Sequence, residues 1–308
     1  MGNKMNLIDL FCQNQQILDW KKNLNQKTRQ LLMGLSGSTK ALAIASALDE
    51  HQKILVMTSG YSEAEKLSSD LISLLGEEKV YNFLADDAPM AEFIFSSQEK
   101  IYTRIGALNF LLDDNESGIL VTNISASHLF LPNPKELKSS VLELKVGQEY
   151  NLDNLVNFLI KIGYRKESQV FNQGEFSLRG DILDIFDKDS ISPYRLEFFG
   201  DEIDGIRIFD SESQTSIENL NQVLIHPAND ILLADEDYLR AQKKIEEAVK
   251  ASQDSRLKSY LEEILQDVKK RQLHPDSRKF LSFFYDKEWT ILDYLPKHTP
   301  ISVSYTHL

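Results

Sequence analysis

The sequence has a single cysteine and no long apolar segment. Cys12 is the only cysteine among 308 residues, so no disulfide can form within the chain. No apolar run approaches the roughly 20 residues that a membrane-spanning helix needs. Residues 1–14 also lack the apolar core of about 7–15 residues that marks a signal peptide. These absences predict a cytoplasmic protein that does not enter a membrane.

Basic residues are scarce relative to acidic ones. The chain has 34 Lys and Arg against 47 Asp and Glu, a net charge of −13. That balance opposes a general nucleic-acid binder, whose affinity depends on cations that neutralise phosphates, although a local basic groove stays open. The six histidines are scattered without metal-ligand spacing, and no G-x-S-x-G nucleophile elbow is present. We therefore expect neither a metal site nor catalytic residues in this chain.

The first part of the chain alternates short strands with helices. Strands are predicted at 29–34, 53–59, 80–85 and 117–124, and helices at 39–51 and 61–76. Ser62 is expected to cap the second helix and Gly76 to end it. Continuous apolar runs such as 53–59 are typical of buried parallel strands. Residues 1–125 therefore predict an α/β layer built on a parallel sheet.

A different pattern follows residues 131–140, which are predicted to form a linker. One helix is expected at 151–163, and strands at 141–147, 167–171, 174–186, 194–200 and 202–210. Within 194–199, Tyr194, Leu196 and Phe198 alternate with Arg195 and Glu197, as in a half-solvated antiparallel strand. A mostly antiparallel α+β domain is thus expected at 126–227.

The remaining residues, 228–308, are predicted to form a third part. One long helix is expected from Asp235 to about Arg271, with Asp235 as its cap, and residues 301–303 look like the start of another strand. The pair Asp235 and Glu236 in ILLADED resembles the acidic pair of an ATPase. It follows a proline-containing loop and opens a helix, so hydrolysis by this chain is not expected.

Residues 33–41, MGLSGSTKA, almost match the phosphate-binding loop G-x-x-x-x-G-K-[ST]. Thr39 stands where the second glycine should be, although that glycine lets backbone N–H groups close on the phosphates. Ala41 stands where a hydroxyl should hold Mg²⁺. The loop can still form a tight turn that leads into a helix. It is predicted not to bind nucleotide through its residues Gly34, Gly37, Ser38, Thr39, Lys40 and Ala41.

Two segments carry a family resemblance. GEFSLRGDILDIF (174–186) and YRLEFFGDEID (194–204) resemble a signature shared by the excision-repair helicase UvrB and the transcription-repair coupling factor family, Mfd. The resemblance extends to about Val303. The degenerate loop favours the coupling factors, and so does the presence of only Tyr81 and Tyr102 at 80–110, where UvrB has a tyrosine-rich hairpin. RIFD (207–210) and LIHPA (224–228) point the same way.

The resemblance implies a fold and a partner. The fold is a degenerate P-loop helicase-like (UvrB-like) parallel-sheet body, formed by 1–125 and 228–308, with residues 126–227 inserted as the docking domain for UvrA. The family's interface residues carry over onto Arg165 and Arg179, and Phe176 matches a family aromatic that could equally be core. Ser177 replaces a further UvrB arginine, so one contact is missing. The implied role is non-catalytic recruitment of UvrA to RNA polymerase stalled at a lesion.

The resemblance also implies what lies elsewhere. Contacts with RNA polymerase and double-stranded DNA, and the ATP- and Mg²⁺-dependent motor, are expected in domains beyond residue 308. This chain itself is expected to be a monomer without a cofactor. Its last residues, SYTHL, do not resemble the family's continuation, which suggests truncation. Two alternatives remain open, namely a divergent DNA-dependent ATPase and a UvrB-like clamp on damaged DNA.

Overall fold

The computed structural model describes residues 6–24, 29–48, 52–87, 98–272 and 279–304. The chain divides into two compact units. Unit 1 comprises residues 1–93, 106–129 and 290–308, and unit 2 comprises residues 94–105 and 130–289. The predicted mixture of a parallel sheet and a mostly antiparallel sheet is confirmed, with the parallel sheet in unit 1 and the mostly antiparallel sheet in unit 2, which also has a two-stranded sheet.

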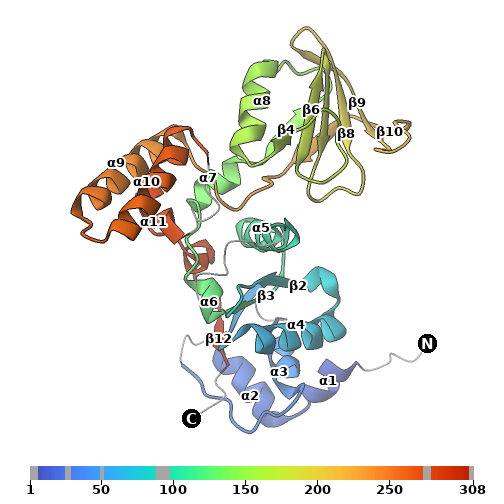
Figure 1. Cartoon of the computed structure of the whole chain (residues 1–308). Helices are drawn as coiled ribbons and strands as arrows, with labels where there is room; N and C mark the ends of the chain where they lie inside the picture. Colours follow the sequence, from blue (N-terminus) through green and yellow to red (C-terminus); the bar gives the residue numbers. More distant parts are fainter. Residues whose placement is uncertain (1–5, 25–28, 49–51, 88–97, 273–278, 305–308) are drawn as a thin grey trace. The chain divides into compact units, whose positions relative to one another are not determined.

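Unit 1 is built on a four-stranded parallel sheet (Figure 1). Its strand order is β12 (Ile301–Val303), β1 (Lys53–Thr58), β3 (Gly118–Asn123) and β2 (Val80–Phe83). The central strands are buried along nearly their whole length, as their continuous apolar runs predict. The helices of this unit are α1 (Leu7–Phe11), α2 (Gln15–Leu24), α3 (Thr39–Ala47), α4 (Tyr61–Leu75) and α6 (Ile124–Ser127).

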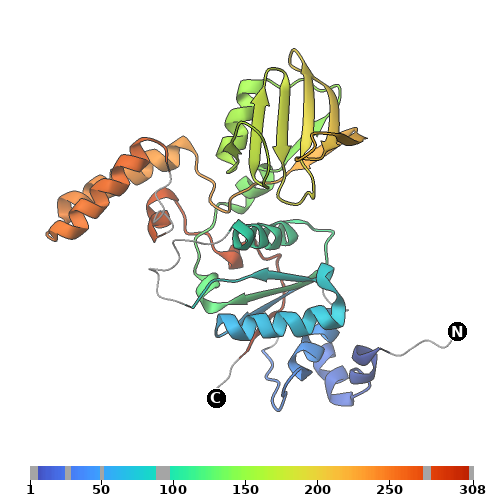
Figure 2. The same cartoon turned by 45° about the vertical axis from the view of Figure 1, so that its right-hand side comes forward.

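Helix α5 (Gln98–Leu112) contributes residues from 106 onward to unit 1 and its earlier residues to unit 2. Its later turns and α4 lie on opposite faces of the parallel sheet (Figure 2). In those turns, the Phe110 ring stacks on Tyr81 of β2 with centroids 3.8 Å apart. Burial and the neighbouring Glu116 raise the pKa of Tyr81. Tyr81 is thus a packing residue of unit 1, and residues 88–97 of the region compared with the UvrB hairpin lie outside the described residues.

Two predictions for unit 1 are wrong. Residues 29–34 form no strand, because this short apolar stretch follows an irregular path into the turn before α3. Ser62 is not the cap of α4. The helix starts at Tyr61, so Gly60 occupies the cap position and Ser62 lies in the first turn. The carboxylate of Asp87 accepts a hydrogen bond from the Tyr61 backbone N–H (2.7 Å) and so supplies the cap from a distant residue. Gly76, at φ +93°, ends α4 as predicted.

Unit 2 contains a six-stranded sheet ordered β10-β9-β8-β7-β6-β5. Strand β5 (Arg165–Lys166) runs parallel to β6, and the remaining neighbours are antiparallel. Helix α8 (Leu152–Lys161) lies beside the sheet (Figure 1). The other strands are β6 (Glu175–Arg179), β7 (Ile182–Phe186), β8 (Tyr194–Phe199), β9 (Glu202–Phe209) and β10 (Ser216–Leu220), with β4 (Leu142–Lys145) and β11 (Gln222–Ile225) paired separately.

Alternation along these strands separates two faces. Phe176, Leu183 and Leu196 are fully buried on one face. Ser177, Asp184 and Arg195 stand opposite one another on the other face. Two predictions need correction here, because 167–171 is a loop and the expected linker contains the short helix α7 (Pro134–Ser139), capped by Asn133. Register therefore places polar residues of three strands side by side, and those of β7 and β8 are charged.

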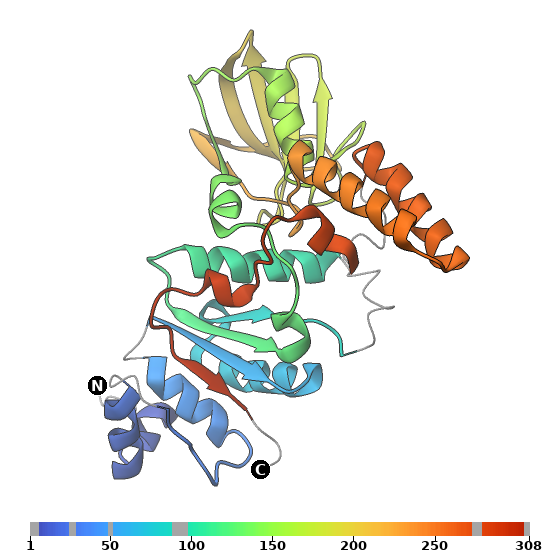
Figure 3. The same cartoon turned by 90° about the vertical axis from the view of Figure 1, so that its left-hand side faces the viewer.

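The predicted single helix at 235–271 is two helices. α9 (Asp235–Ala251) and α10 (Ser255–Lys269) form a hairpin (Figure 3), and Asp254 caps the second helix by accepting from the backbone N–H groups of Arg256 and Leu257. Their shared core includes Ile245, Ile264 and Phe284 of α11 (Leu281–Phe284). These residues group with unit 2, whereas the sequence assigned 228–308 to the helicase-like body. The predicted domain boundaries stay a prediction.

The two ends of the segment 130–289, which makes up most of unit 2, lie next to each other. The backbone N–H of Leu131 donates to the Trp289 carbonyl (2.9 Å), and the two residues form an isolated antiparallel bridge. The strand predicted at 301–303 is confirmed as β12, an edge strand of the parallel sheet. Across the described ranges, the helices are all too short or too polar to traverse a lipid bilayer.

Candidate functional site

The degenerate loop keeps its turn but not its nucleotide-binding groups. Gly34 (φ +78°) and Gly37 (φ +55°) adopt left-handed backbone conformations that favour glycine. The Thr39 hydroxyl donates to the Ser36 carbonyl (2.5 Å), inside the loop itself. Ala41 is fully buried in the core of unit 1, at the position where a P-loop presents its Mg²⁺-binding hydroxyl.

Lys40 is engaged within unit 1. Its Nζ lies 3.5 Å from Glu63 Oε1 and donates to Ser304 Oγ at 3.1 Å. The hydroxyls of Ser304 (2.7 Å) and Ser59 (2.9 Å) both donate to the Glu63 carboxylate. Burial acts to raise the pKa of Glu63, but these hydrogen bonds and the Lys40 charge outweigh it and lower the pKa. Lys40 therefore pairs with an ionised protein carboxylate.

The acidic residues Asp235 and Glu236 of ILLADED lie at the start of α9. Asp235 is not the cap, because Ala234 occupies that position and its N–H donates to Asp237 Oδ2 (2.8 Å). Asp235 forms an ion pair with Arg271 (2.9 Å), on a solvent-exposed surface. Asp235 thus serves the helix hairpin of unit 2.

The predicted partner-binding residue Arg179 stands at the end of β6. Its Nη2 donates to Asp184 Oδ2 (2.6 Å), and 45% of its side chain is exposed. Arg195 donates to both oxygens of the same carboxylate, at 2.7 and 2.8 Å. Its guanidinium also lies 4.1 Å from the ring centroid of Phe209. We call Arg179, Asp184 and Arg195 the Asp184 cluster.

Burial differs sharply within the Asp184 cluster. Asp184 is fully buried, and only 12% of the Arg195 side chain is exposed. Hydrogen bonding to Asp184 raises the pKa of Arg195. The cluster therefore holds one arginine inside the sheet face and presents the other, Arg179, to solvent in a fixed position.

Arg165, the second predicted partner-binding arginine, lies on edge strand β5. Its Nη2 is 3.6 Å from Glu175 Oε1, and 64% of its side chain is exposed. Glu175 is buried and accepts hydrogen bonds from the backbone N–H groups of Phe171 and Asn172, both at 2.9 Å. Burial acts to raise the pKa of Glu175, but these bonds and the charge of Arg165 lower it overall. We call Arg165, Phe171, Asn172 and Glu175 the Glu175 cluster.

Phe176 lies on the opposite side of β6 from these charges. Its side chain is fully buried within unit 2, so it has no surface through which to touch a partner. Ser177, which replaces the further UvrB arginine, is also buried and donates to the Ser168 carbonyl (2.9 Å). Period-2 alternation places Glu175, Ser177 and Arg179 on one face and Phe176 on the other, and this signal was available in the sequence.

A third polar cluster, Asp187, Asp189 and His226, brings three ligand-type atoms within 4.8 Å of one another. Protein groups already use these carboxylates. Asp187 Oδ1 accepts from the Tyr164 hydroxyl (2.9 Å) and the His226 backbone N–H (2.8 Å). Lys188 Nζ lies 2.6 Å from both oxygens of Asp189. The arrangement ties the segment after β11 to the end of β7.

Comparison of the sequence with known proteins matches the chain to a family. Residues 142–230 match the family described as the UvrB interaction domain. The chain is 33% identical over 279 residues to the transcription-repair-coupling factor of Bacillus subtilis (strain 168), covering 88% of this chain and 24% of that protein. The predicted resemblance is confirmed.

Further transcription-repair-coupling factors show similar identity. That of Staphylococcus epidermidis (strain ATCC 12228 / FDA PCI 1200) is 33% identical over 281 residues, covering 89% of this chain and 24% of the relative. That of Staphylococcus aureus (strain MRSA252) is 30% identical over 293 residues, covering 92% and 25%. The chain thus spans about a quarter of the length of the curated relatives it matches.

Proposed function

We propose that this chain is a UvrA-docking module of transcription-repair coupling. One observation carries the proposal. Within the part that matches the UvrB interaction domain, Arg165 and Arg179 are exposed, and each is held by a buried carboxylate. Arginine presents a planar set of donors suited to paired hydrogen bonds with carboxylates, so the partner surface should carry acidic groups.

The docked module would act within a larger assembly. UvrA bound at this face would be brought to an RNA polymerase stalled at a lesion, through other domains of the longer protein. Those domains would contact RNA polymerase and double-stranded DNA and hold the ATP-driven motor. Unit 1 would act as a non-catalytic helicase-like body that supports the docking domain.

The docking proposal predicts that Arg165→Ala/Arg179→Ala loses about 2–5 kcal/mol of binding free energy toward purified UvrA. The physical reason is that the partner's carboxylates would be left desolvated without their cations. Isothermal titration calorimetry with the whole chain measures the change, and circular dichroism checks that the variant is folded. Arg256→Ala, at an exposed arginine on α10, is the matched control and should bind like wild type. Absence of wild-type binding would refute the proposal.

The non-catalytic part of the proposal predicts that the chain shows no saturable binding of a fluorescent ATP analogue. Lys40 is paired with Glu63, and the loop lacks both the second glycine and the Mg²⁺-binding hydroxyl. Fluorescence anisotropy with Mg²⁺ present is the measurement. Lys40→Ala is the control, since saturable binding that disappears in this variant would show a functional nucleotide site instead.

A further inference from the structure

Phe171 is an exposed aromatic residue in the loop between β5 and β6. Phe171 is 55% exposed. Full burial of a phenylalanine side chain normally adds about 1.5–3 kcal/mol to the free energy of unfolding, and Phe171 forgoes much of that gain. The neighbouring residue points the other way. Val170 is fully buried in a cluster with Phe186 and Phe209. Because Val170 fixes the loop on the sheet, Phe171 is held outward.

Hydrogen bonds fix the same loop at a second point. The buried Glu175 carboxylate accepts from the Phe171 N–H, the Asn172 N–H and the Asn172 side-chain amide (3.0 Å). This carboxylate also pairs with Arg165. One buried group therefore positions an exposed aromatic ring and an exposed guanidinium together. Aromatic and arginine side chains are the common energetic centres of protein interfaces, and positioning them before binding lowers the entropic cost of association.

We propose that Phe171 is a contact residue of the docking face and that Glu175 is its positioning residue. The inference rests on the proposed docking function and adds the chemistry of the partner. The matching surface of UvrA would carry an apolar recess beside the carboxylate that receives Arg165. Phe171 thereby takes the aromatic role that the sequence assigned to the buried Phe176.

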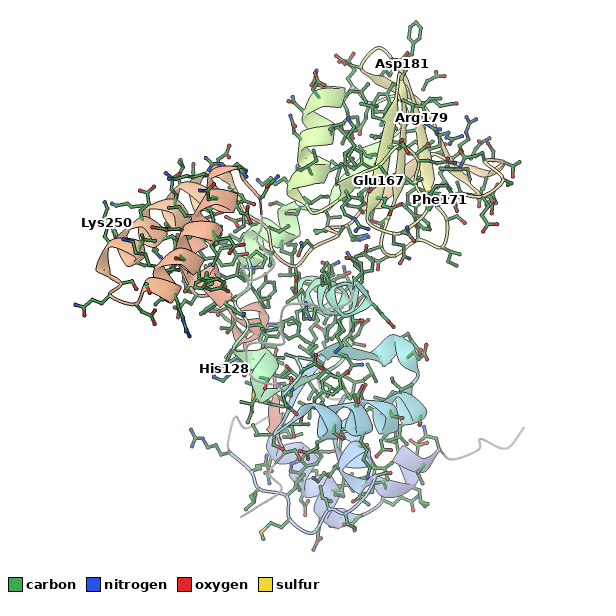
Figure 4. The ribbon with its side chains drawn as sticks, viewed as in Figure 1. His128, Glu167, Phe171, Arg179, Asp181 and Lys250 are labelled. Carbon is green, nitrogen blue, oxygen red and sulfur yellow. The ribbon has the colours of Figure 1, made fainter. Side chains whose placement is uncertain are left out.

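The dimensions of the sheet agree with a single docking face. Glu175 begins β6 and Arg179 ends it, four residues and about 13 Å apart along a strand. Figure 4 shows Phe171, Glu167 and Arg179 in the same part of unit 2. A standard interface of about 800 Å² per partner spans roughly 30 Å, so the Glu175 and Asp184 clusters fit within one contact area.

Binding of the whole chain to purified UvrA, measured by calorimetry, tests the contact. Phe171→Ala should raise Kd about tenfold or more, while the thermal midpoint changes little because the ring is exposed. Ile160→Ala is the matched control, since Ile160 is an apolar residue of α8 with a similar exposure of 53%. Its Kd should equal that of wild type.

The positioning role of Glu175 needs a separate readout. Glu175→Gln, which keeps the side-chain size, should raise Kd in the wild-type background. It should cause little further loss in the Arg165→Ala/Phe171→Ala background, because its effect acts through those two residues. Equal losses in both backgrounds would overturn the positioning role. Wild-type affinity in Phe171→Ala, or an equal loss in Ile160→Ala, would overturn the contact. Failure of wild type to bind would overturn the docking function itself.

Discussion

Replacement of Asp184 with alanine is expected to lower the free energy of unfolding of unit 2 by about 3–5 kcal/mol. Asp184 is fully buried and neutralises Arg195, of which only 12% of the side chain is exposed. Alanine would leave the Arg195 guanidinium largely out of water and without its carboxylate. The loss should also free Arg179, which the same carboxylate fixes.

Urea unfolding followed by the fluorescence of Trp289 measures this effect. Trp289 belongs to unit 2 and Trp20 to unit 1, and these are the only tryptophans, so a Trp20→Phe background isolates the signal. Glu197→Ala is the control, since Glu197 pairs with Arg207 but 40% of its side chain is exposed. Glu197→Ala should lower the free energy of unfolding by less than about 1 kcal/mol. Equal costs for the two variants would contradict the role assigned to Asp184.

Arg104→Ala is expected to lower the free energy of unfolding of unit 2 by a comparable amount, about 3–5 kcal/mol. Arg104 Nε lies 2.7 Å from Asp230 Oδ2, and both side chains are almost completely buried. This pair joins the first turns of α5 to the segment after β11, both within unit 2. Alanine removes the cation and leaves the Asp230 charge in a low-dielectric site.

The double variant Arg104→Met/Asp230→Leu separates the ion pair from simple packing. Replacing both charges of a buried pair by apolar groups is often nearly neutral, so the double variant should be more stable than Arg104→Ala. The same urea experiment, read from Trp289, compares them. A double variant that is less stable than Arg104→Ala would contradict the explanation by an uncompensated Asp230 charge.

The elements that sequence alone predicts best are those with long, consistent patterns. Strands β1 and β3 follow from continuous apolar runs, and β8 follows from strict alternation. Residues 29–34 have a similar apolar content but no pairing partner among the described strands. The break between α9 and α10 falls at Ser252 and Asp254, which are weak helix formers, and Asp is a favoured N-cap residue. The sequence therefore carried a signal for this break that the single-helix prediction overlooked.

The candidate site was predicted in part, and the missing part has a physical cause. Arg165 and Arg179 were named from the resemblance. Their anchors, Glu175 and Asp184, depend on which strands pair and in what register, and no local pattern specifies that. Phe171 was missed because its outward direction is set by the burial of Val170 against Phe186 and Phe209.

The Leu131–Trp289 bridge has an evolutionary consequence. It makes residues 132–288 a segment whose two ends are hydrogen-bonded neighbours, and the UvrB interaction domain at 142–230 lies wholly inside it. Insertions with adjacent ends are tolerated best, because the host chain need not be re-routed to accept them. Changes of sequence or length inside the segment can therefore leave the junction at Leu131 and Trp289 in place, although the Arg104–Asp230 pair also ties the segment to α5.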